Sequence, residues 1–197
     1  MSLKGTQTTT SYIDWNDFKS LVSKLERDKE YKFCLLISIG VLTGLRISDL
    51  LRLKYSDILG KDILQLKEQK TGNMRSIKIN NDLLELVDRI KVKIGVKDET
   101  TFMFLNRFGT KPIDKSYVNV KLKSIFRKYR IRVDGNVSSH LFRKTLGREV
   151  MERNNYSNEH LILLSELFGH SSLQITKRYL GIRRDEIHNI YDSVSLK

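Results

Sequence analysis

The chain has 197 residues, a net charge of +13 and a pI near 9.8, with 40% hydrophobic and 30% charged residues. This length and apolar content suffice for one globular domain, and no apolar run approaches the ~18–20 residues that a membrane span needs. The single cysteine, Cys34, excludes an internal disulfide and any cysteine-based zinc site, which fits a reducing cytoplasm.

The basic residues are concentrated in one part of the chain. Residues 111–153 hold 12 Lys/Arg and 4 Asp/Glu, a local net charge of +8. Such an excess indicates a polyanionic partner, although a generic basic surface or non-specific RNA affinity would give the same composition. The charge therefore selects a class of partner and not a reaction.

The N-terminal third predicts helices. We interpret residues 1–10, rich in threonine and serine, as a loose tail or a cloning remnant. Apolar residues then recur at helical spacing. Asp14 is the expected cap of a first helix, Gly44 the expected end of a second, and a short third helix is expected around Asp49.

After the third expected helix, the spacing of apolar residues changes from helical to nearly alternating. Residues 63–67 and 75–79 flank the sequence Gln-Lys-Thr-Gly-Asn, which is typical of a turn. We therefore predict an antiparallel β-hairpin with Lys70 near its tip. Residues 102–105 form a short buried run whose secondary structure the pattern leaves open.

Helical spacing resumes after the hairpin. The predicted helices cover residues 81–94, Asp114 to about Tyr129, a Ser138 or Ser139 cap to about Glu152, residues 159–168, residues 172–180 and an amphipathic segment from Asp185 to Val194. We expect a mainly α fold of about nine helices with one small antiparallel hairpin, in a single domain.

Several residues stand out for their chemistry, although each alone has an ordinary explanation. His140 and Arg143 lie three apart in a first helical turn beside exposed backbone N–H groups, which makes a seat for phosphate. A capping histidine with a surface arginine would look the same. Arg46 follows the tight turn at Gly44, and a structural pair with Asp49 would explain it.

The other candidates are equally ambiguous when taken singly. Lys70 fits an ordinary solvated lysine at a hairpin tip. His170 follows Gly169 at the end of a helix, where capping or half-buried histidines are common. Tyr179 fits a core position in a short helix.

The order of these residues nevertheless resembles the catalytic domain of the tyrosine recombinases, the phage integrase family. The chain reads Thr-Gly-Leu-Arg-Ile-Ser-Asp-Leu over 43–50, Lys-Thr-Gly over 70–72, His-Leu-Phe-Arg over 140–143 and Leu-Phe-Gly-His over 167–170. All six positions of the family's active-site pattern are filled, by Arg46, Lys70, His140, Arg143, His170 and Tyr179. The resemblance implies the recombinase catalytic core for residues 11–181 and a tail helix for 182–197.

The resemblance also implies a mechanism. Tyr179 would attack a DNA phosphodiester, form a 3′-phosphotyrosine and release a 5′-hydroxyl, without metal, ATP or other cofactor. Arg46 and Arg143 would hold the phosphate, and Lys70 would protonate the leaving oxygen. His140 would be a base or proton relay for Tyr179, and His170 would donate a hydrogen bond to the phosphate.

We expect double-stranded DNA as the partner, held mainly through its phosphates. The expected contacts are Lys115, Lys121, Lys123, Arg127, Lys128 and Lys144. The resemblance implies a homotetramer on synapsed DNA sites and a monomer or weak oligomer when free. The apolar residues of the C-terminal tail would pack either on a neighbouring protomer or on their own domain. These residues are Ile187, Ile190, Tyr191 and Val194.

Family members usually carry a DNA-clamping helical domain before the catalytic one. We therefore expect this chain to be a fragment of a longer integrase or transposase of a mobile element, acting in the cytoplasm on the nucleoid. A naturally minimal enzyme is the alternative.

Two other functions stay open. A type IB topoisomerase uses a closely similar residue set, but the Leu-Phe-Gly-His box and its short spacing to Tyr179 favour a recombinase. A non-catalytic DNA-binding module is disfavoured because every catalytic position is filled.

Overall fold

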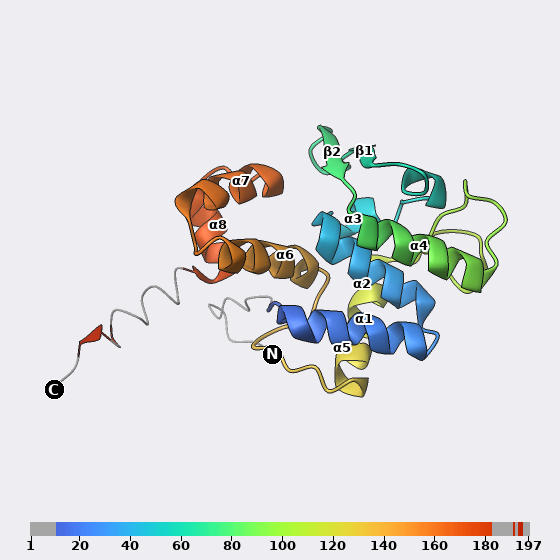
Figure 1. Cartoon of the computed structure of the whole chain (residues 1–197), viewed down its shortest axis with the longest axis horizontal. Coiled ribbons are helices and arrows are strands. Elements are labelled where there is room, and N and C mark those ends of the chain that lie inside the picture. Colours follow the sequence, from blue (N-terminus) through green and yellow to red (C-terminus); the bar gives the residue numbers. More distant parts are fainter. Residues whose placement is uncertain (1–10, 183–190, 192, 195–197) are drawn as a thin grey trace.

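The computed structural model describes residues 11–182, Tyr191, Ser193 and Val194. Within these residues it has eight α-helices, one 3-10 helix and one two-stranded sheet, so the predicted mainly α fold with a hairpin is confirmed. The elements are α1 (Trp15–Arg27), α2 (Tyr31–Thr43), α3 (Ile47–Leu50), η1 (Tyr55–Asp57), β1 (Ile63–Lys67), β2 (Met74–Lys78), α4 (Asn81–Ile94), α5 (Lys115–Lys128), α6 (His140–Arg153), α7 (Asn158–Phe168) and α8 (Leu173–Leu180) (Figure 1).

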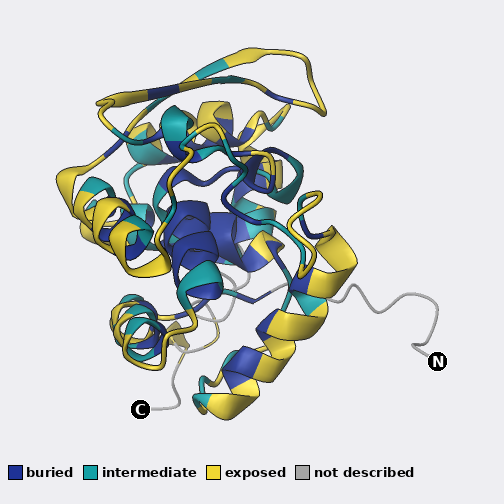
Figure 2. Ribbon diagram, turned by 90° about the vertical axis from the view of Figure 1, so that its right-hand side faces the viewer, coloured by how far each residue is buried: buried dark blue, intermediate teal, exposed yellow. Residues whose placement is uncertain are grey.

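Helix α2 is the centre of the larger part of the molecule. Its sequence is apolar on nearly all sides, and buried residues gather around it while exposed ones lie outside (Figure 2). Helices α1, α4 and α6 pack against it. Gly40 permits the close approach of α6, because a Cβ there would lie 2.5 Å from the Phe142 ring. Gly44 ends the helix with a φ of +59°, which glycine adopts without strain.

The predicted helix ends are largely confirmed. Asp14 accepts hydrogen bonds from the backbone N–H groups of Asn16 and Asp17, and Asp114 accepts one from Tyr117. Ser139 occupies the N-cap position of α6 but makes no capping bond with its side chain. The short third helix expected around Asp49 is present and ends at Leu50.

The hairpin pairs β1 with β2 antiparallel, from Ile63 opposite Lys78 to Lys67 opposite Met74. The connecting turn therefore holds residues 68–73, and Lys70 lies in it, exposed, as predicted. The run at 102–105 is neither helix nor strand: Phe102 and Leu105 form isolated bridges to Lys54 and Pro112, and the two residues between them form a turn.

The buried apolar residues form two clusters. The larger one takes in α1 to α5 and the start of α6, ending at Phe142. The smaller one consists of Met151, Leu161, Leu164, Phe168, Leu180 and Ile182. Helix α6 belongs to both and joins them, and α7 and α8 lie beyond it (Figure 1).

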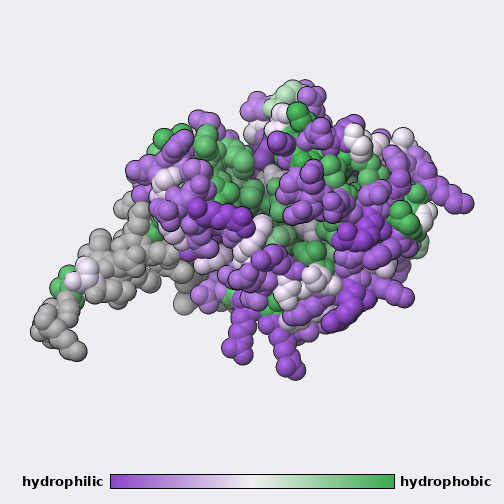
Figure 3. Space-filling view, viewed as in Figure 1, coloured by the Kyte–Doolittle hydropathy of each residue, from purple (hydrophilic) through white to green (hydrophobic). Residues whose placement is uncertain are grey.

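On the face seen in Figure 3, hydrophilic side chains cover most of the surface, and hydrophobic ones gather over α7, where Ile162, Leu163 and Leu167 are exposed. None of the helices in the described ranges has the length and apolar character to cross a membrane. The predicted tail segment from Asp185 lies mostly outside the described residues, and Tyr191 and Val194 are exposed.

Candidate active site

Two arginines meet at one backbone oxygen where the two clusters join. Arg46, the residue before α3, donates from Nη2 to the carbonyl of Phe168 at 3.3 Å. Arg143, on the first turn of α6, donates to the same carbonyl at 3.0 Å and to the carbonyl of Gly44 at 3.0 Å. The shared acceptor lies at the C-terminal end of α7, where carbonyls carry partial negative charge. Residues 97 positions apart are thus brought side by side.

The pair of guanidinium groups is suited to hold an anion. Arg143 is only 6% exposed. Burial, together with the charges of Arg46 and Arg75 nearby, lowers the pKa of Arg143 to about 10. It still carries its proton at neutral pH, so two like charges stand close together in a partly desolvated site. A phosphate with two non-bridging oxygens would relieve that repulsion.

Tyr179 lies beside this pair. Its hydroxyl donates to the carbonyl of His140 at 3.1 Å, and its ring contacts His170 and Phe168 edge-on, at centroid distances of 5.2 and 5.6 Å. Burial raises the pKa of the phenol to about 12 even though Arg143 favours the phenolate. In the free protein the phenol is therefore protonated, and attack on phosphorus requires a group that removes the proton.

The two candidate histidines differ in their surroundings. His170 is half-buried, and its Nδ1 lies 2.9 Å from the hydroxyl of the fully buried Thr176. Burial and the neighbouring arginines lower the pKa of His170. His140 is exposed, and partial desolvation with the surrounding lysine and arginine charges lowers its pKa. The charge of Lys70 is among those that act on His140. Both rings are therefore neutral at pH 7.

The structure thus gathers Arg46, Arg143, His170, Tyr179 and the backbone of His140 directly. Lys70 contributes from the hairpin turn through its charge. The ordinary explanation of Arg46, a pair with Asp49, does not apply: Asp49 accepts from the backbone N–H of Gln69 at 2.9 Å, and Arg46 pairs with Glu68.

Sequence reasoning missed three residues of this site: Glu68, Arg75 and Thr176. Glu68 lies between Arg46 and Arg75, at 2.5 and 3.3 Å. No periodic pattern marks these positions. The signal that was available is the polar run next to a predicted turn, and a threonine three residues before the candidate nucleophile.

The predicted DNA-contact residues fall into two groups. Lys115, Lys121, Lys123 and Arg127 are exposed along α5. Lys128 is exposed too, but its Nζ lies 3.5 Å from an oxygen of Asp28. Lys144 is buried at 7% exposure, and a Cβ on Gly181 would lie 3.8 Å from its Nζ. The assignment of Lys144 to a DNA contact does not agree with this burial, because α6 is covered on several sides.

Comparison with known proteins gives consistent matches. The family model described as the phage integrase family matches residues 11–186. YoeC of Bacillus subtilis, named a probable integrase/recombinase, is 30% identical over 173 residues, covering 87% of this chain and 86% of that protein. The tyrosine recombinase XerH of Campylobacter jejuni is 27% identical over 156 residues, which are 78% of this chain but 42% of that protein. The chain thus spans less than half of the XerH length.

Solved structures agree on the fold. The crystal structure of XerA recombinase superposes with a TM-score of 0.69 at 18% identity, covering 92% of this chain and 64% of that one. XerH bound to a palindromic difH substrate, in a post-cleavage complex, gives 0.68 at 20% identity, covering 98% and 56%. The predicted recombinase catalytic core is therefore confirmed as the fold.

Proposed function

Because this chain belongs to the phage integrase family, we propose that it is a site-specific DNA recombinase that cuts and rejoins DNA strands through Tyr179. One observation carries the proposal above all others. Arg46 and Arg143 converge on the carbonyl of Phe168. The hydroxyl of Tyr179 donates to the carbonyl of His140, on the same first turn of α6 that carries Arg143. A phosphate seated on the arginines would stand next to a nucleophile.

The proposed first step is a transfer of the phosphoryl group to the protein. The Tyr179 oxygen forms a bond to phosphorus, and the bond from phosphorus to the 5′ oxygen breaks. The phenol proton passes to the imidazole of His140, and Lys70 gives a proton to the 5′ oxygen as it leaves. The 3′-phosphotyrosine keeps the energy of the broken bond, so the return step on another strand needs no ATP.

The remaining side chains stabilise the transition state. Arg46 and Arg143 would bind the non-bridging oxygens, whose charge grows as phosphorus becomes five-coordinate. His170 would donate to one of the same oxygens from Nε2, in the tautomer whose Nδ1 accepts from the hydroxyl of Thr176. Loss of one such donor typically costs ~10²–10³ in rate, or about 3–4 kcal/mol.

Exposed basic residues of α5 would bind the DNA backbone. Lys115, Lys121, Lys123 and Arg127 present four cations on one helix. Binding through phosphates releases counterions, so the affinity should fall steeply with salt. Their substitution by alanine should weaken binding to all DNA sequences alike.

We further propose that four copies assemble on paired DNA sites of a mobile element, with the C-terminal tail packing on a neighbour. The integrase part of this proposal follows the name of the Bacillus subtilis relative. Truncation after Gly181 tests the tail: it should weaken assembly on DNA in gel-shift titrations while the monomer stays folded. Unchanged assembly would remove this part of the proposal.

The decisive experiment for the function is covalent trapping. The chain is incubated with a nicked suicide substrate, and a protein–DNA band is sought on a denaturing gel. Wild type should give the band, Tyr179→Phe should give none, and Tyr156→Phe, at a half-exposed surface tyrosine, should behave as wild type. A band from Tyr179→Phe, or none from wild type, would contradict the proposal. Exchanged strands from two DNA sites would separate a recombinase from a topoisomerase.

A further inference from the structure

A buried carboxylate connects the arginine of the site with the turn that carries Lys70. Glu68 is 8% exposed. Its Oε2 lies 2.5 Å from Nη1 of Arg46 and accepts the hydroxyl of Thr71 at 2.7 Å. Its Oε1 accepts from Nη1 of Arg75 at 3.3 Å. One carboxylate therefore ties the residue before α3 to both sides of the hairpin turn.

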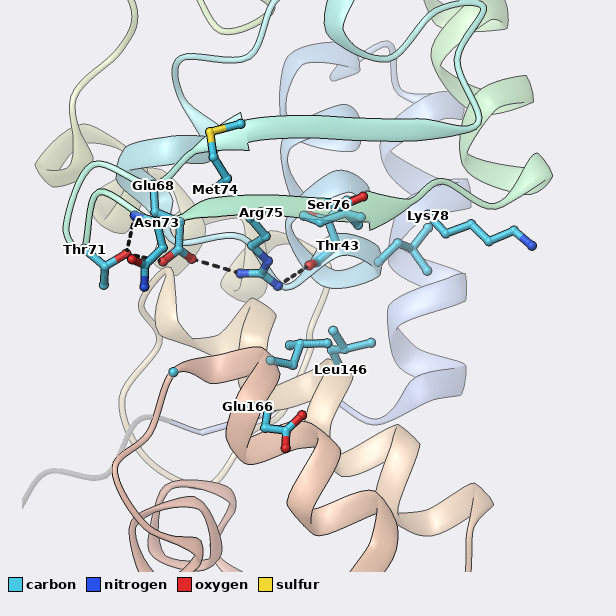
Figure 4. A pocket seen from close by; sticks show the side chains of 14 residues that line it. Thr43, Glu68, Thr71, Asn73, Met74, Arg75, Ser76, Lys78, Leu146 and Glu166 are labelled. Carbon is cyan, nitrogen blue, oxygen red and sulfur yellow. Dashed lines mark hydrogen bonds and ion pairs between the residues drawn. The ribbon is translucent and has the colours of Figure 1, made fainter.

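The same contacts continue to the end of α2. Arg75 donates from Nη2 to the carbonyl of Thr43 at 3.2 Å, and Figure 4 shows Glu68 between Thr71 and Arg75, with Arg75 reaching Thr43. Thr43 immediately precedes Gly44, whose carbonyl accepts from Arg143. The hairpin is thus attached to the segment that supports both catalytic arginines.

Lys70 lies between two fixed points of the turn. On one side, the N–H of Gln69 donates to Asp49 at 2.9 Å; on the other, the hydroxyl of Thr71 donates to Glu68. The backbone of Glu68 also closes the turn, accepting from Gly72 at 2.9 Å and donating to Asn73 at 2.9 Å. The side chain of Lys70 is exposed, but the backbone that carries it is held.

The carboxylate is ionised at neutral pH. Burial alone would raise the pKa of Glu68, but the hydrogen bonds from Thr71 and Arg46 and the charge of Arg46 lower it overall. Two guanidinium groups pair with it, those of Arg46 and Arg75, and its negative charge also raises the pKa of Arg143 against the effect of burial. A charge-assisted bond of this kind is short and directional, and it fixes the planar guanidinium in place.

We propose that Glu68 is a positioning residue that holds the Lys70 turn in register with Arg46, so that phosphate binding and proton delivery are set by one side chain. This inference rests on the proposed function. It contrasts with a simpler role for Glu68, that of a carboxylate that competes with phosphate for Arg46. In that case its removal would strengthen DNA binding and speed cleavage.

The test compares two suicide substrates. One has the natural oxygen at the 5′ leaving position, and the other has sulfur in its place; a thiolate leaves without a proton from Lys70. Glu68→Gln keeps the shape and removes the charge. Single-turnover cleavage of the oxygen substrate by Glu68→Gln should be slower by ~10²-fold. On the sulfur substrate the defect should shrink at least tenfold, and the affinity for DNA should change little.

Two control variants establish what the comparison of substrates measures. Lys70→Ala should show the same recovery on the sulfur substrate, which establishes that this substrate reports proton delivery. Glu166→Gln is the matched control, because Glu166 is an exposed carboxylate lining the same cavity of about 620 Å³ as Glu68. It should leave both rates unchanged.

Three outcomes would overturn the coupling. If Glu68→Gln slowed cleavage of both substrates equally, Glu68 would support Arg46 without affecting proton delivery by Lys70. Faster cleavage or tighter binding would make it a competitor of phosphate. If Glu68→Gln does not fold, Thr71→Val decides, since it removes the bond to Glu68 together with one that the Thr71 hydroxyl accepts from the N–H of Asn73 at 3.3 Å. An equal defect on the two substrates would again contradict the coupling. Absence of covalent product from wild type on either substrate would instead reject the proposed function itself.

Discussion

The two hydrophobic clusters of this protein support different parts of the candidate site. The large cluster, centred on α2, holds the segment before Arg46 and the base of the hairpin. The small cluster has six buried residues and holds α8, the helix of Tyr179. The arginine pair therefore rests on both clusters, because its shared acceptor belongs to Phe168 of the small one, whereas the helix of Tyr179 depends on the part with less buried apolar surface. Function should consequently be more sensitive than global stability to damage in the small cluster.

The largest effect is expected at Phe168, the centre of the small cluster. It is 1% exposed, its ring contacts Tyr179 and His170, and the guanidinium of Arg143 lies 4.7 Å from its centroid. Phe168→Ala should lower the free energy of unfolding by about 3–5 kcal/mol and abolish cleavage. Denaturant titration and the trapping assay measure both. Phe108→Ala, at a ring that is 70% exposed, is the control. Near wild-type cleavage by Phe168→Ala would show that the small cluster does not place Tyr179.

A matched pair of glycines compares the two regions. A Cβ on Gly40 would lie 2.5 Å from the Phe142 ring in the large cluster, and one on Gly147 would lie 2.5 Å from the end of Leu180 in the small one. Both alanine variants should lose about 1–3 kcal/mol of stability. Gly40→Ala should lose more, because a buried ring yields less than a leucine methyl group.

The catalytic effects of the two glycine variants should follow the opposite order. Leu180 adjoins Tyr179, so Gly147→Ala should slow cleavage more than Gly40→Ala does. Chemical denaturation and single-turnover rates measured on the same preparations provide the comparison. The same order in both measurements would contradict the separation of roles between the clusters.

An ion pair far from the site should affect stability alone. Glu26 binds Arg89 at 2.8 Å and Lys93 at 2.7 Å, and these hydrogen bonds lower its pKa from 4.5 to about 2. Since the folded pKa is depressed, the stabilisation is complete above about pH 4.5 and is lost as the pH falls towards 2. Glu26→Gln should lower the free energy of unfolding by about 1–2 kcal/mol at pH 7, a value reduced because solvent screens the partly exposed partners. The difference should vanish as the pH falls through about 2.

Thermal unfolding of wild type and Glu26→Gln across this pH range measures the difference. Cleavage at neutral pH should stay unchanged, because the pair joins α1 to α4 in the large cluster. A constant difference in stability at all pH values would exclude ionisation of Glu26 as its source.

The smallest effect on stability is expected at Thr176. Its hydroxyl lies 2.9 Å from Nδ1 of His170 and donates to the carbonyl of Ser172 at 3.5 Å. If the hydroxyl turned its single proton to Nδ1 instead, the hydrogen of the neutral imidazole would be on Nε2. Thr176→Val should change stability by about 1 kcal/mol or less and slow cleavage by ~10-fold. In a His170→Ala background the same change should have no further effect on the rate. An additive effect there would mean that Thr176 acts independently of the histidine.

The sequence allowed the prediction of most elements, because apolar spacing and end residues such as Asp14, Asp114 and Gly44 are local signals. The six candidate residues came from their order along the chain. The convergence of Arg46 and Arg143 on the Phe168 carbonyl depends on how the start of α3, α6 and the end of α7 pack together, which no local pattern contains.

Two expectations drawn from nearby residues meet a different arrangement in the structure. A pair with Asp49 is the ordinary structural explanation of Arg46. Arg46, however, has extended backbone angles and precedes α3, so the helical i, i+3 neighbour relation does not apply. The basic segment around Lys144 suggests a DNA contact, whereas α6 lies between two clusters and the side chain is buried; the contact stays a prediction that the burial does not favour. The ion pairs of Glu68 with Arg46 and Arg75 depend both on the hairpin register and on the position of α3, so no local pattern predicts them.

The point on which both guanidinium groups converge is a main-chain oxygen. A substitution at residue 168 can alter the ring beneath it but cannot delete the carbonyl. The acceptor that orients the two arginines is therefore inherited with the backbone, whatever side chain evolution or engineering places at this position.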